Sequence, residues 1–215
     1  KDFTEKRVRY YKSLNTPPQT RLCLKKVKKE KFKILHIGHL RGIATLAGLE
    51  LLAYEILPYL KHNIGSENFE IHLVGGFFET LPEKIKQELT DPTIIVRGQL
   101  NPPDEEFLSS NVIVVPTPIE LGIRVRIITA LSFGNCIIAH EANKKGIPEL
   151  DHGNNCLLGA SGKEIAEHTE CVFKKPSLQY SLEANAADTY NKFFSIEHFG
   201  LELSTAINST LPVFK

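Results

Sequence analysis

Short apolar runs alternate with amphipathic stretches along the chain from residue 33 onward. Six of these runs are typical of buried strands, and each ends in a glycine, a proline or a histidine. They are KILHIG (33–38), FEIHLVGG (69–76), TIIVRG (93–98), NVIVVP (111–116), NCIIAH (135–140) and NNCLLG (154–159). Between them, leucines and isoleucines recur at spacings of three and four from residue 43 to residue 60, which predicts a helix. Shorter helices are predicted within 81–89 and 102–110.

This alternation predicts the α/β class: a doubly wound, Rossmann-like parallel sheet of about six strands with helices on both faces. In such sheets the ligands bind beyond the carboxyl ends of the strands. After the last strand, residues 177–208 are mainly helical and polar, with an interruption near IEHFG (196–200).

Composition places the chain among ordinary globular proteins, with 215 residues, 42% hydrophobic and 24% charged. No apolar stretch approaches the roughly 20 residues of a membrane span, and no signal-peptide pattern opens the sequence. The four cysteines lack the spacing of a metal or redox site. We therefore expect a cytoplasmic protein.

Charge is concentrated at the start of the chain, where residues 1–33 hold twelve Lys and Arg against three Asp and Glu. A solvated linker is one interpretation of this run. The other is peripheral attraction to anionic lipid headgroups. Nucleic-acid binding is less favoured, because the aromatic residues of this segment form no stacking repeat.

Two glycine-containing turns carry the candidate chemistry. GHLRG (38–42) follows the first strand, and ELGIRVR (120–126) follows the fourth. Glycine lets a phosphate approach backbone amides, and arginine offers a fork of donors to its oxygens. Plain turns and surface ion pairs would explain the same residues. Together the two turns favour a nucleotide-diphosphate ligand, although neither has the G-x-G-x-x-G spacing of a nicotinamide-dependent oxidoreductase.

The later half of the chain resembles a known family. VIVVPTPIELGIRVRIITALSFGNCIIAH (112–140) and KGIPELDHGNNCLLG (145–159) are similar to the donor-binding, C-terminal half of GT-B glycosyltransferases related to family 4, also called group 1. The resemblance covers roughly residues 33–195. The matching positions are Pro116, Gly122, Ala130, Gly134, Ala139, Gly146, Glu149, Gly153, Asn155, Leu157 and Leu158.

One departure from the family lies at residue 129. The family usually has a glutamate there, which holds the donor ribose, and this chain has Thr129. A family variant reads G-x-R-x-K-x-x-E, and Gly122, Arg124 and Arg126 match it apart from that glutamate. A non-catalytic nucleotide-sugar-binding or scaffold module therefore stays an alternative to an active transferase.

The resemblance implies retaining transfer of a sugar from a nucleotide-diphosphate sugar, which is the donor substrate, without an essential metal and without a separate cofactor. Arg126 and Arg41 are the implied catalytic residues, which would stabilise the leaving diphosphate. The implied donor-binding residues are Gly38, His39, Arg97, Gly98, Gln99, Glu120, Gly122, Ile123, Arg124, Thr129 and Glu149. Two of them have plainer interpretations, since His39 could be an exposed loop histidine and Glu149 an ordinary helix-capping carboxylate.

The resemblance also suggests a division of the chain. GT-B enzymes hold the acceptor, here expected to be a carbohydrate or a lipid-linked molecule, on a separate N-terminal domain. Only one doubly wound sheet is visible in the sequence, so we expect a fragment that is inactive alone. It comprises a basic connecting segment (1–32), a nucleotide-sugar-binding domain (33–195) and a C-terminal tail helix (196–215).

Overall fold

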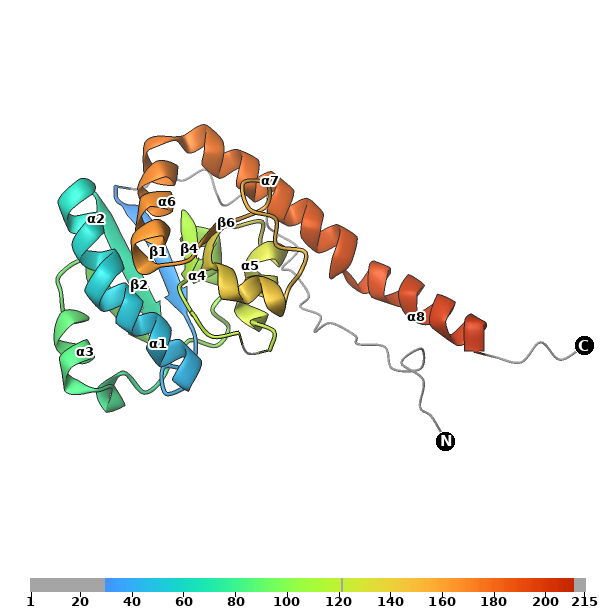
Figure 1. Ribbon diagram of the computed structural model, residues 1–215, viewed down its shortest axis with the longest axis horizontal. Coiled ribbons are helices and arrows are strands. Elements are labelled where there is room, and N and C mark those ends of the chain that lie inside the picture. Colours follow the sequence, from blue (N-terminus) through green and yellow to red (C-terminus); the bar gives the residue numbers. More distant parts are fainter. Residues whose placement is uncertain (1–29, 121, 211–215) are drawn as a thin grey trace, which may run out of the picture.

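A six-stranded parallel sheet forms the centre of the protein, as seen in a computed structural model that describes residues 30–120 and 122–210 (Figure 1). The strands are β1 (Phe32–Ile37), β2 (Phe69–Val74), β3 (Ile94–Gly98), β4 (Val112–Val115), β5 (Cys136–His140) and β6 (Leu157–Gly159). They coincide with the six apolar runs of the sequence. The predicted doubly wound α/β fold is therefore confirmed.

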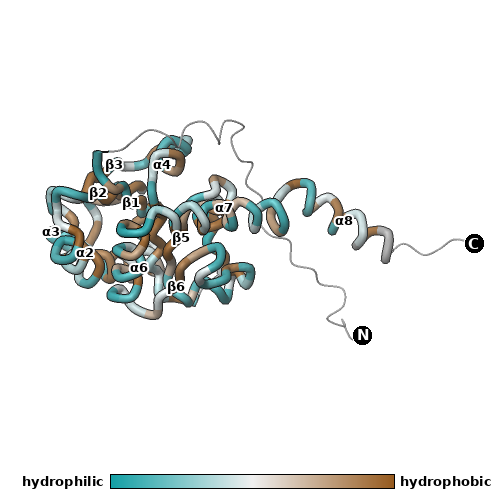
Figure 2. Tube along the Cα trace, turned by 90° about the horizontal axis from the view of Figure 1, so that it is seen from above, coloured by the Kyte–Doolittle hydropathy of each residue, from teal (hydrophilic) through white to brown (hydrophobic). Residues whose placement is uncertain are grey.

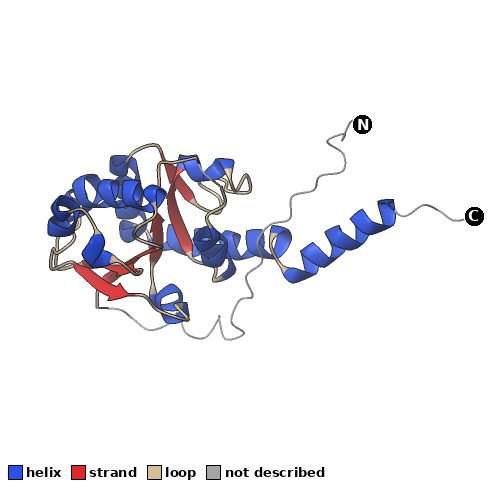
Figure 3. Cartoon of the chain, turned by 90° about the horizontal axis from the view of Figure 1, so that it is seen from below, coloured by secondary structure: helices blue, strands red, loops and turns tan. Residues whose placement is uncertain are grey.

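The sheet has the order β3-β2-β1-β4-β5-β6, and every neighbouring pair is parallel. Figure 3 shows the strands lying in the interior between the helices. The helices are α1 (Ile43–Leu51), a π-helical segment η3 (Leu52–Ile56), α2 (Leu57–Asn63), α3 (Glu83–Glu88), α4 (Asp104–Ser109), α5 (Val125–Ser132), α6 (Gly162–Lys174), α7 (Pro176–Phe193) and α8 (Ile196–Thr210). Short 3₁₀ turns, η4 and η5, cover Phe78–Thr80 and Glu141–Lys145.

The sheet has a separate hydrophobic core on each face, because successive side chains of a strand point to opposite faces. In β4, for example, Val112 and Val114 face the core beneath α1, α2, α3 and α6. Ile113 and Val115 face the core beneath α4, α5 and α7. Burial on both faces explains why the strands are continuous apolar runs instead of alternating polar and apolar residues.

The stretch Ile43–Asn63 is one continuous helix that includes the π-helical segment. Pro58 has no N–H to donate to the carbonyl four residues earlier, and in this region the N–H of Leu57 donates to Leu52, five residues back. By length and composition this helix could cross a membrane. It buries Leu49 and Ile56 completely against the sheet, as the core helix of a doubly wound fold does.

The last helix, α8, extends away from the rest of the protein (Figures 1 and 2). It begins after a break at Ser195, whose Oγ accepts a hydrogen bond from the His198 N–H at 3.2 Å. The tail helix predicted for 196–215 is thus helical over Ile196–Thr210. Residues 1–29, which make up most of the predicted basic segment, lie outside the described part of the chain.

Candidate functional site

The strand order reverses between β1 and β4, which are neighbours in the sheet although far apart in sequence. In open α/β sheets this reversal opens a crevice beyond the carboxyl ends of the two strands, where ligands bind. Gly38 follows β1 at this point, and Thr117 follows β4 two residues after the strand ends. The two glycine turns predicted from the sequence therefore converge at the crevice.

Arg126 bridges the two strand ends. It stands in the first turn of α5, yet its side chain reaches back to the sheet. Its Nη1 donates to the carbonyl of Ile37 at 2.9 Å, and its Nη2 donates to Oγ1 of Thr117 at 2.7 Å. The Nε atom is buried without a hydrogen-bond partner among the described residues. The guanidinium thus keeps unused donors at the switch point.

No carboxylate balances this charge, because none of the ion pairs within residues 30–120 and 122–210 includes Arg126 or Arg124. Burial, and then the charge of Arg124, lowers the pKa of Arg126 from 12.5 to about 10. The guanidinium is therefore still charged at neutral pH. A partly buried cation with only neutral partners is costly, and an anion bound beside it would offset that cost.

His36 lies in β1 and is fully buried. It is close enough to Arg126 for the charge of the guanidinium to affect the pKa of the imidazole. Its Nδ1 lies 3.1 Å from the carbonyl of Val114, so Nδ1 carries the proton and donates. Burial, and then the charge of Arg126, lowers the pKa of His36 to about 3. The imidazole is therefore neutral, and Arg126 provides the positive charge at this place.

Gly38 leaves room for the guanidinium of Arg126, which a side chain at this position would displace. A Cβ added at residue 38 would lie 2.1 Å from Nη1 of Arg126, and one added at Gly75 would lie 2.0 Å from the carbonyl oxygen of Gly38. Gly38 is thus enclosed between Gly75, which follows β2, and Arg126. The glycine turn after β1 serves close packing around the guanidinium, as well as any approach of a ligand to the backbone.

Arg124 occupies the N-cap position of α5 and donates from Nη2 to the carbonyl of Ile119 at 3.1 Å. It contacts neither strand end in the way that Arg126 does. The geometry therefore assigns the contacts with the two strand ends to Arg126.

Arg41 and His39 lie on the other side of Gly38, next to β2. The Arg41 guanidinium lies over the ring of Phe77, 5.1 Å from its centroid, and the His39 ring lies 5.0 Å from the same ring. Both residues are exposed. These predicted site residues therefore lie around an aromatic side chain that the sequence did not single out.

Three of the predicted donor-binding residues lie at the end of β3, with Arg97 and Gly98 inside the strand and Gln99 directly after it. Arg97 is exposed, and its Nε donates to Oε1 of Glu106 at 2.9 Å, so its charge is already paired. Gly98 has a φ of 67°, in the left-handed region. Gln99 turns toward the loop after β2, since a Cβ added at Gly76 would lie 3.2 Å from its Oε1.

The loop before α5 holds three more of the predicted residues. Glu120 forms an exposed ion pair with Lys145 at 2.6 Å. Gly122 has a φ of 59°, and its carbonyl would lie 2.2 Å from a Cβ added at Gly146. Ile123 packs partly buried against the second core. These contacts fix the course of the loop that leads to the arginines.

Thr129 stands one turn further along α5 than the two arginines. Its Oγ1 donates to the carbonyl of Val125 at 3.0 Å, a bond within its own helix. A hydroxyl at this position can hydrogen-bond a ligand, but it cannot supply the charged contact of the glutamate that the family usually has there.

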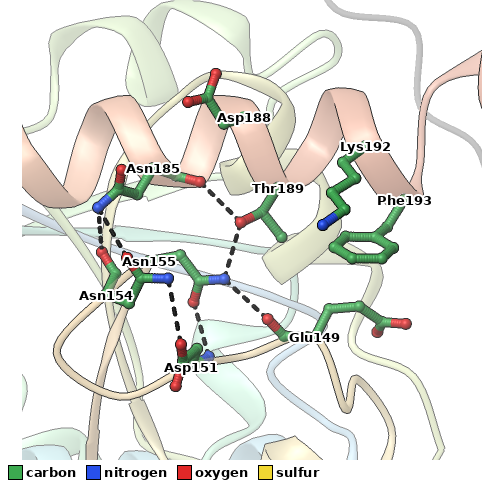
Figure 4. Close-up of a pocket in the computed structure, with 9 residues that line it drawn as sticks. All are labelled: Glu149, Asp151, Asn154, Asn155, Asn185, Asp188, Thr189, Lys192 and Phe193. Atoms are coloured by element: carbon green, nitrogen blue, oxygen red, sulfur yellow. Dashed lines mark hydrogen bonds between the residues drawn. The ribbon is translucent and has the colours of Figure 1, made fainter.

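Glu149 lines a pocket of about 350 Å³ between its own loop and α7 (Figure 4). Asn155 holds this loop in place, because its Nδ2 donates to the Glu149 carbonyl at 2.8 Å and to Oγ1 of Thr189 at 2.9 Å. The other lining residues are Asp151, Asn154, Asn185, Asp188, Lys192 and Phe193. None of them belongs to the predicted site, so the structure does not bring Glu149 together with Arg126.

Sequence reasoning missed three residues here, namely Thr117, His36 and Phe77. Thr117 directly follows the proline that ends the fourth apolar run, so its place at a strand end could have been noticed. His36 stands inside an apolar run, which indicates burial but no partner. Among the described residues, no group of three or more His, Cys, Asp or Glu side chains could hold a metal ion.

Comparison with known proteins identifies the family of the chain and relatives that share its fold. Residues 31–174 match the family of group 1 glycosyl transferases. No curated protein matches the chain in sequence. Many solved structures share the fold.

Among them is HepE of Anabaena in complex with UDP and glucose, which is 15% identical with a TM-score of 0.69 over 85% of this chain and 49% of HepE. A glycosyltransferase of Rickettsia africae is 15% identical, with a TM-score of 0.68 over 86% of this chain and 50% of that protein. The C-terminal domain of LpcC, a group 1 family protein of Francisella tularensis, is 18% identical, with a TM-score of 0.57 over 84% of this chain and 95% of that domain.

The chain thus spans about half the length of HepE and of the Rickettsia africae protein, and nearly all of the LpcC domain. At these identities the structural likeness shows the fold, whereas the match over residues 31–174 shows the family. With a GT-B glycosyltransferase fold and a family match over most of its length, this chain belongs to the group 1 glycosyl transferases.

Proposed function

We propose that the chain binds a nucleotide-diphosphate sugar at the crevice between β1 and β4, as the donor half of a retaining glycosyltransferase. One observation carries the proposal: Arg126 is partly buried at the switch point, has only neutral partners and retains unused donors. A diphosphate supplies the missing negative charge and several acceptor oxygens. HepE, which shares the fold, was solved with UDP and with UDP-glucose.

In the proposed reaction, the sugar leaves a nucleoside diphosphate whose negative charge grows as the glycosidic bond breaks. Arg126 is held in place before that charge develops, so it stabilises the transition state without first reorganising. Arg41 would add positive charge on the other side of Gly38, from its place over Phe77. The acceptor, a carbohydrate or lipid-linked molecule, would be held by a second domain, so the chain alone should bind the donor without turnover.

Titration calorimetry with UDP, GDP, ADP and TDP tests the binding step. At least one nucleoside diphosphate should bind, and Arg126→Ala should lower its affinity by roughly ten- to a hundred-fold, as expected for a lost charge-assisted hydrogen bond. Arg126→Lys keeps the charge and should retain part of the affinity. Lys174→Ala, which removes an exposed charge at the far end of α6, should change nothing.

The absence of binding by all four nucleotides at millimolar concentration would overturn the proposal. Equal affinity of Arg126→Ala and the parent would show that the ligand lies elsewhere. If the donor binds but the chain supplied with its acceptor domain does not turn it over, the alternative of a non-catalytic nucleotide-sugar-binding module gains support. The lack of a carboxylate at Thr129 favours that alternative.

A cytoplasmic location with peripheral membrane contact through residues 1–32 stays a prediction. Sedimentation with anionic vesicles at low salt, against neutral vesicles as a control, tests this contact. Release near physiological ionic strength is expected, since salt screens surface charges over about 8 Å.

A further inference from the structure

Phe77 lies in the loop after β2 in a backbone conformation that bulky side chains seldom adopt. Its φ is 75°, and it is the only non-glycine residue with a positive φ among those that the structure describes. Left-handed backbone at a residue with a large side chain costs stability, and such strain concentrates at functional sites. The position would be easier to fill with glycine or asparagine, so the ring itself calls for an explanation.

Exposure alone does not supply that explanation, because single exposed hydrophobic side chains are normal on protein surfaces. Phe77 as a whole residue is 44% exposed. Two neighbours nevertheless fix it: the Arg41 guanidinium at 5.1 Å from the ring centroid and the His39 ring at 5.0 Å, tilted by 52°. A cation over an aromatic face is attracted by the ring's electrons, so the three side chains form an ordered aromatic platform.

The platform adjoins the proposed diphosphate site. Gly38 is enclosed between Gly75, which lies two residues before Phe77, and Arg126. The end of β1 therefore has Arg126 on its β4 side and the platform on its β2 side. A ligand whose phosphates bind at Arg126 can extend over β1 and reach the ring.

The nucleoside is the part of the ligand expected on this side. In doubly wound sheets the phosphates bind at the first turn and switch point, and the nucleoside extends toward the end of the second strand. The loop after β3 touches the same place, since Gln99, one of the donor-binding residues that the resemblance implies, packs against Gly76.

We propose that Phe77 is the stacking surface for the nucleobase, held in place by Arg41 and His39. This inference rests on the proposed binding of a nucleoside diphosphate and names the residue that holds its base. Stacking on an aromatic ring tolerates any base, because every base presents a flat π-face. The site should therefore discriminate weakly among UDP, GDP, ADP and TDP.

A single tryptophan tests the contact directly, because the natural sequence contains none. In Phe77→Trp, each of the four nucleoside diphosphates should quench or shift the fluorescence, while inorganic pyrophosphate should leave it unchanged. Tyr180→Trp, at a 67% exposed position on α7, is the matched control and should not respond to any ligand. A silent Phe77→Trp reporter, while calorimetry shows UDP bound to the same variant, would overturn the proposal.

Truncation of the Phe77 side chain distinguishes the contribution of the base to affinity from that of the phosphates. Phe77→Ala should lower UDP affinity by about five- to a hundred-fold, as expected for one base stacked on one ring, and should leave pyrophosphate affinity unchanged. Phe77→Gly should bind UDP equally weakly yet raise the unfolding midpoint, because glycine relieves the left-handed backbone. A structural residue would instead destabilise the protein when replaced.

Three further outcomes overturn the inference. UDP affinity that is unchanged in Phe77→Ala but still depends on Arg126 would leave the proposed function standing and remove Phe77 from it. A loss confined to UDP-glucose would place the sugar, instead of the base, on the ring. Absence of nucleotide binding by the parent protein would overturn the proposed function and this inference together.

Discussion

Nη2 of Arg126 donates a hydrogen bond to Oγ1 of Thr117 over 2.7 Å, which ties the first turn of α5 to the loop after β4. Thr117 is fully buried and is itself held in place. Its carbonyl accepts from Nδ2 of Asn143 at 3.2 Å, and Gly48 of α1 packs so closely that an added Cβ would lie 3.2 Å from Oγ1. A rigid residue therefore sets the direction of the guanidinium.

Thr117→Val should weaken nucleoside diphosphate binding by about tenfold, because valine keeps the shape but removes an acceptor whose hydrogen bond with the charged Arg126 is worth about 1.5 kcal/mol. Thr117→Ser retains the hydroxyl and should restore the affinity. Calorimetry in the Arg126→Ala background tests whether Thr117 affects nucleotide binding through Arg126. If Thr117→Val still costs tenfold in that background, Thr117 does not act through the arginine.

Arg124→Ala should weaken binding less than Arg126→Ala does. The Arg124 guanidinium donates to the Ile119 carbonyl, so its contribution to the crevice is mainly its charge at a distance. We expect a change of about two- to fivefold that shrinks with added salt, because exposed charges are screened. Calorimetry at two salt concentrations measures both variants. A larger loss of affinity for Arg124→Ala than for Arg126→Ala would show that Arg124, and not Arg126, makes the main contact with the diphosphate.

His36 should make the protein sensitive to acid. In the folded state burial, and then the Arg126 charge, hold its pKa at about 3, whereas the unfolded chain titrates near 6.5. Below pH 6.5 the unfolded state binds a proton that the folded state does not. The free energy of unfolding should therefore fall by up to about 1.4 kcal/mol per pH unit from this residue as the pH drops from 6.5 toward 3.

Urea unfolding between pH 7.5 and pH 4 measures this dependence. His36→Asn should flatten the curve in that range, while His62→Asn, on the exposed end of α2, should leave the slope unchanged. Parallel curves for His36→Asn and the parent would show that His36 does not remain neutral in the folded protein.

Glu106→Gln should lower the free energy of unfolding by about 3–5 kcal/mol. The Glu106 carboxylate is buried and accepts from Lys33 and His72 at 2.8 Å and from Arg97 at 2.9 Å. Burial by itself raises the pKa of this carboxyl, but the bonds and charges of Lys33 and His72 hold the pKa below its usual value. Without the carboxylate charge, the buried ammonium of Lys33 loses its ionic partner, and thermal unfolding should reveal the lost stability. The exposed Glu83→Gln should cost under about 1 kcal/mol.

Local pattern was sufficient to determine the six strands and the fold class. A parallel strand buried on both faces must be a short continuous apolar run, and all six runs became strands. The glycine turns after the first and fourth runs were also visible, because backbone freedom at glycine is a property of the residue itself. The two arginines after Gly122 could therefore be singled out before any contact was known.

Only the tertiary structure decided what those side chains meet. Arg126 bonds to Ile37, 89 residues earlier, because the strand order places β4 beside β1. The same folding pairs Arg97 with Glu106 and places Glu149 beside α7, away from the crevice. Sequence pattern reports the periodicity of one segment, whereas a site is built where several segments end. The contacts between those ends depend on crossovers that no single segment encodes.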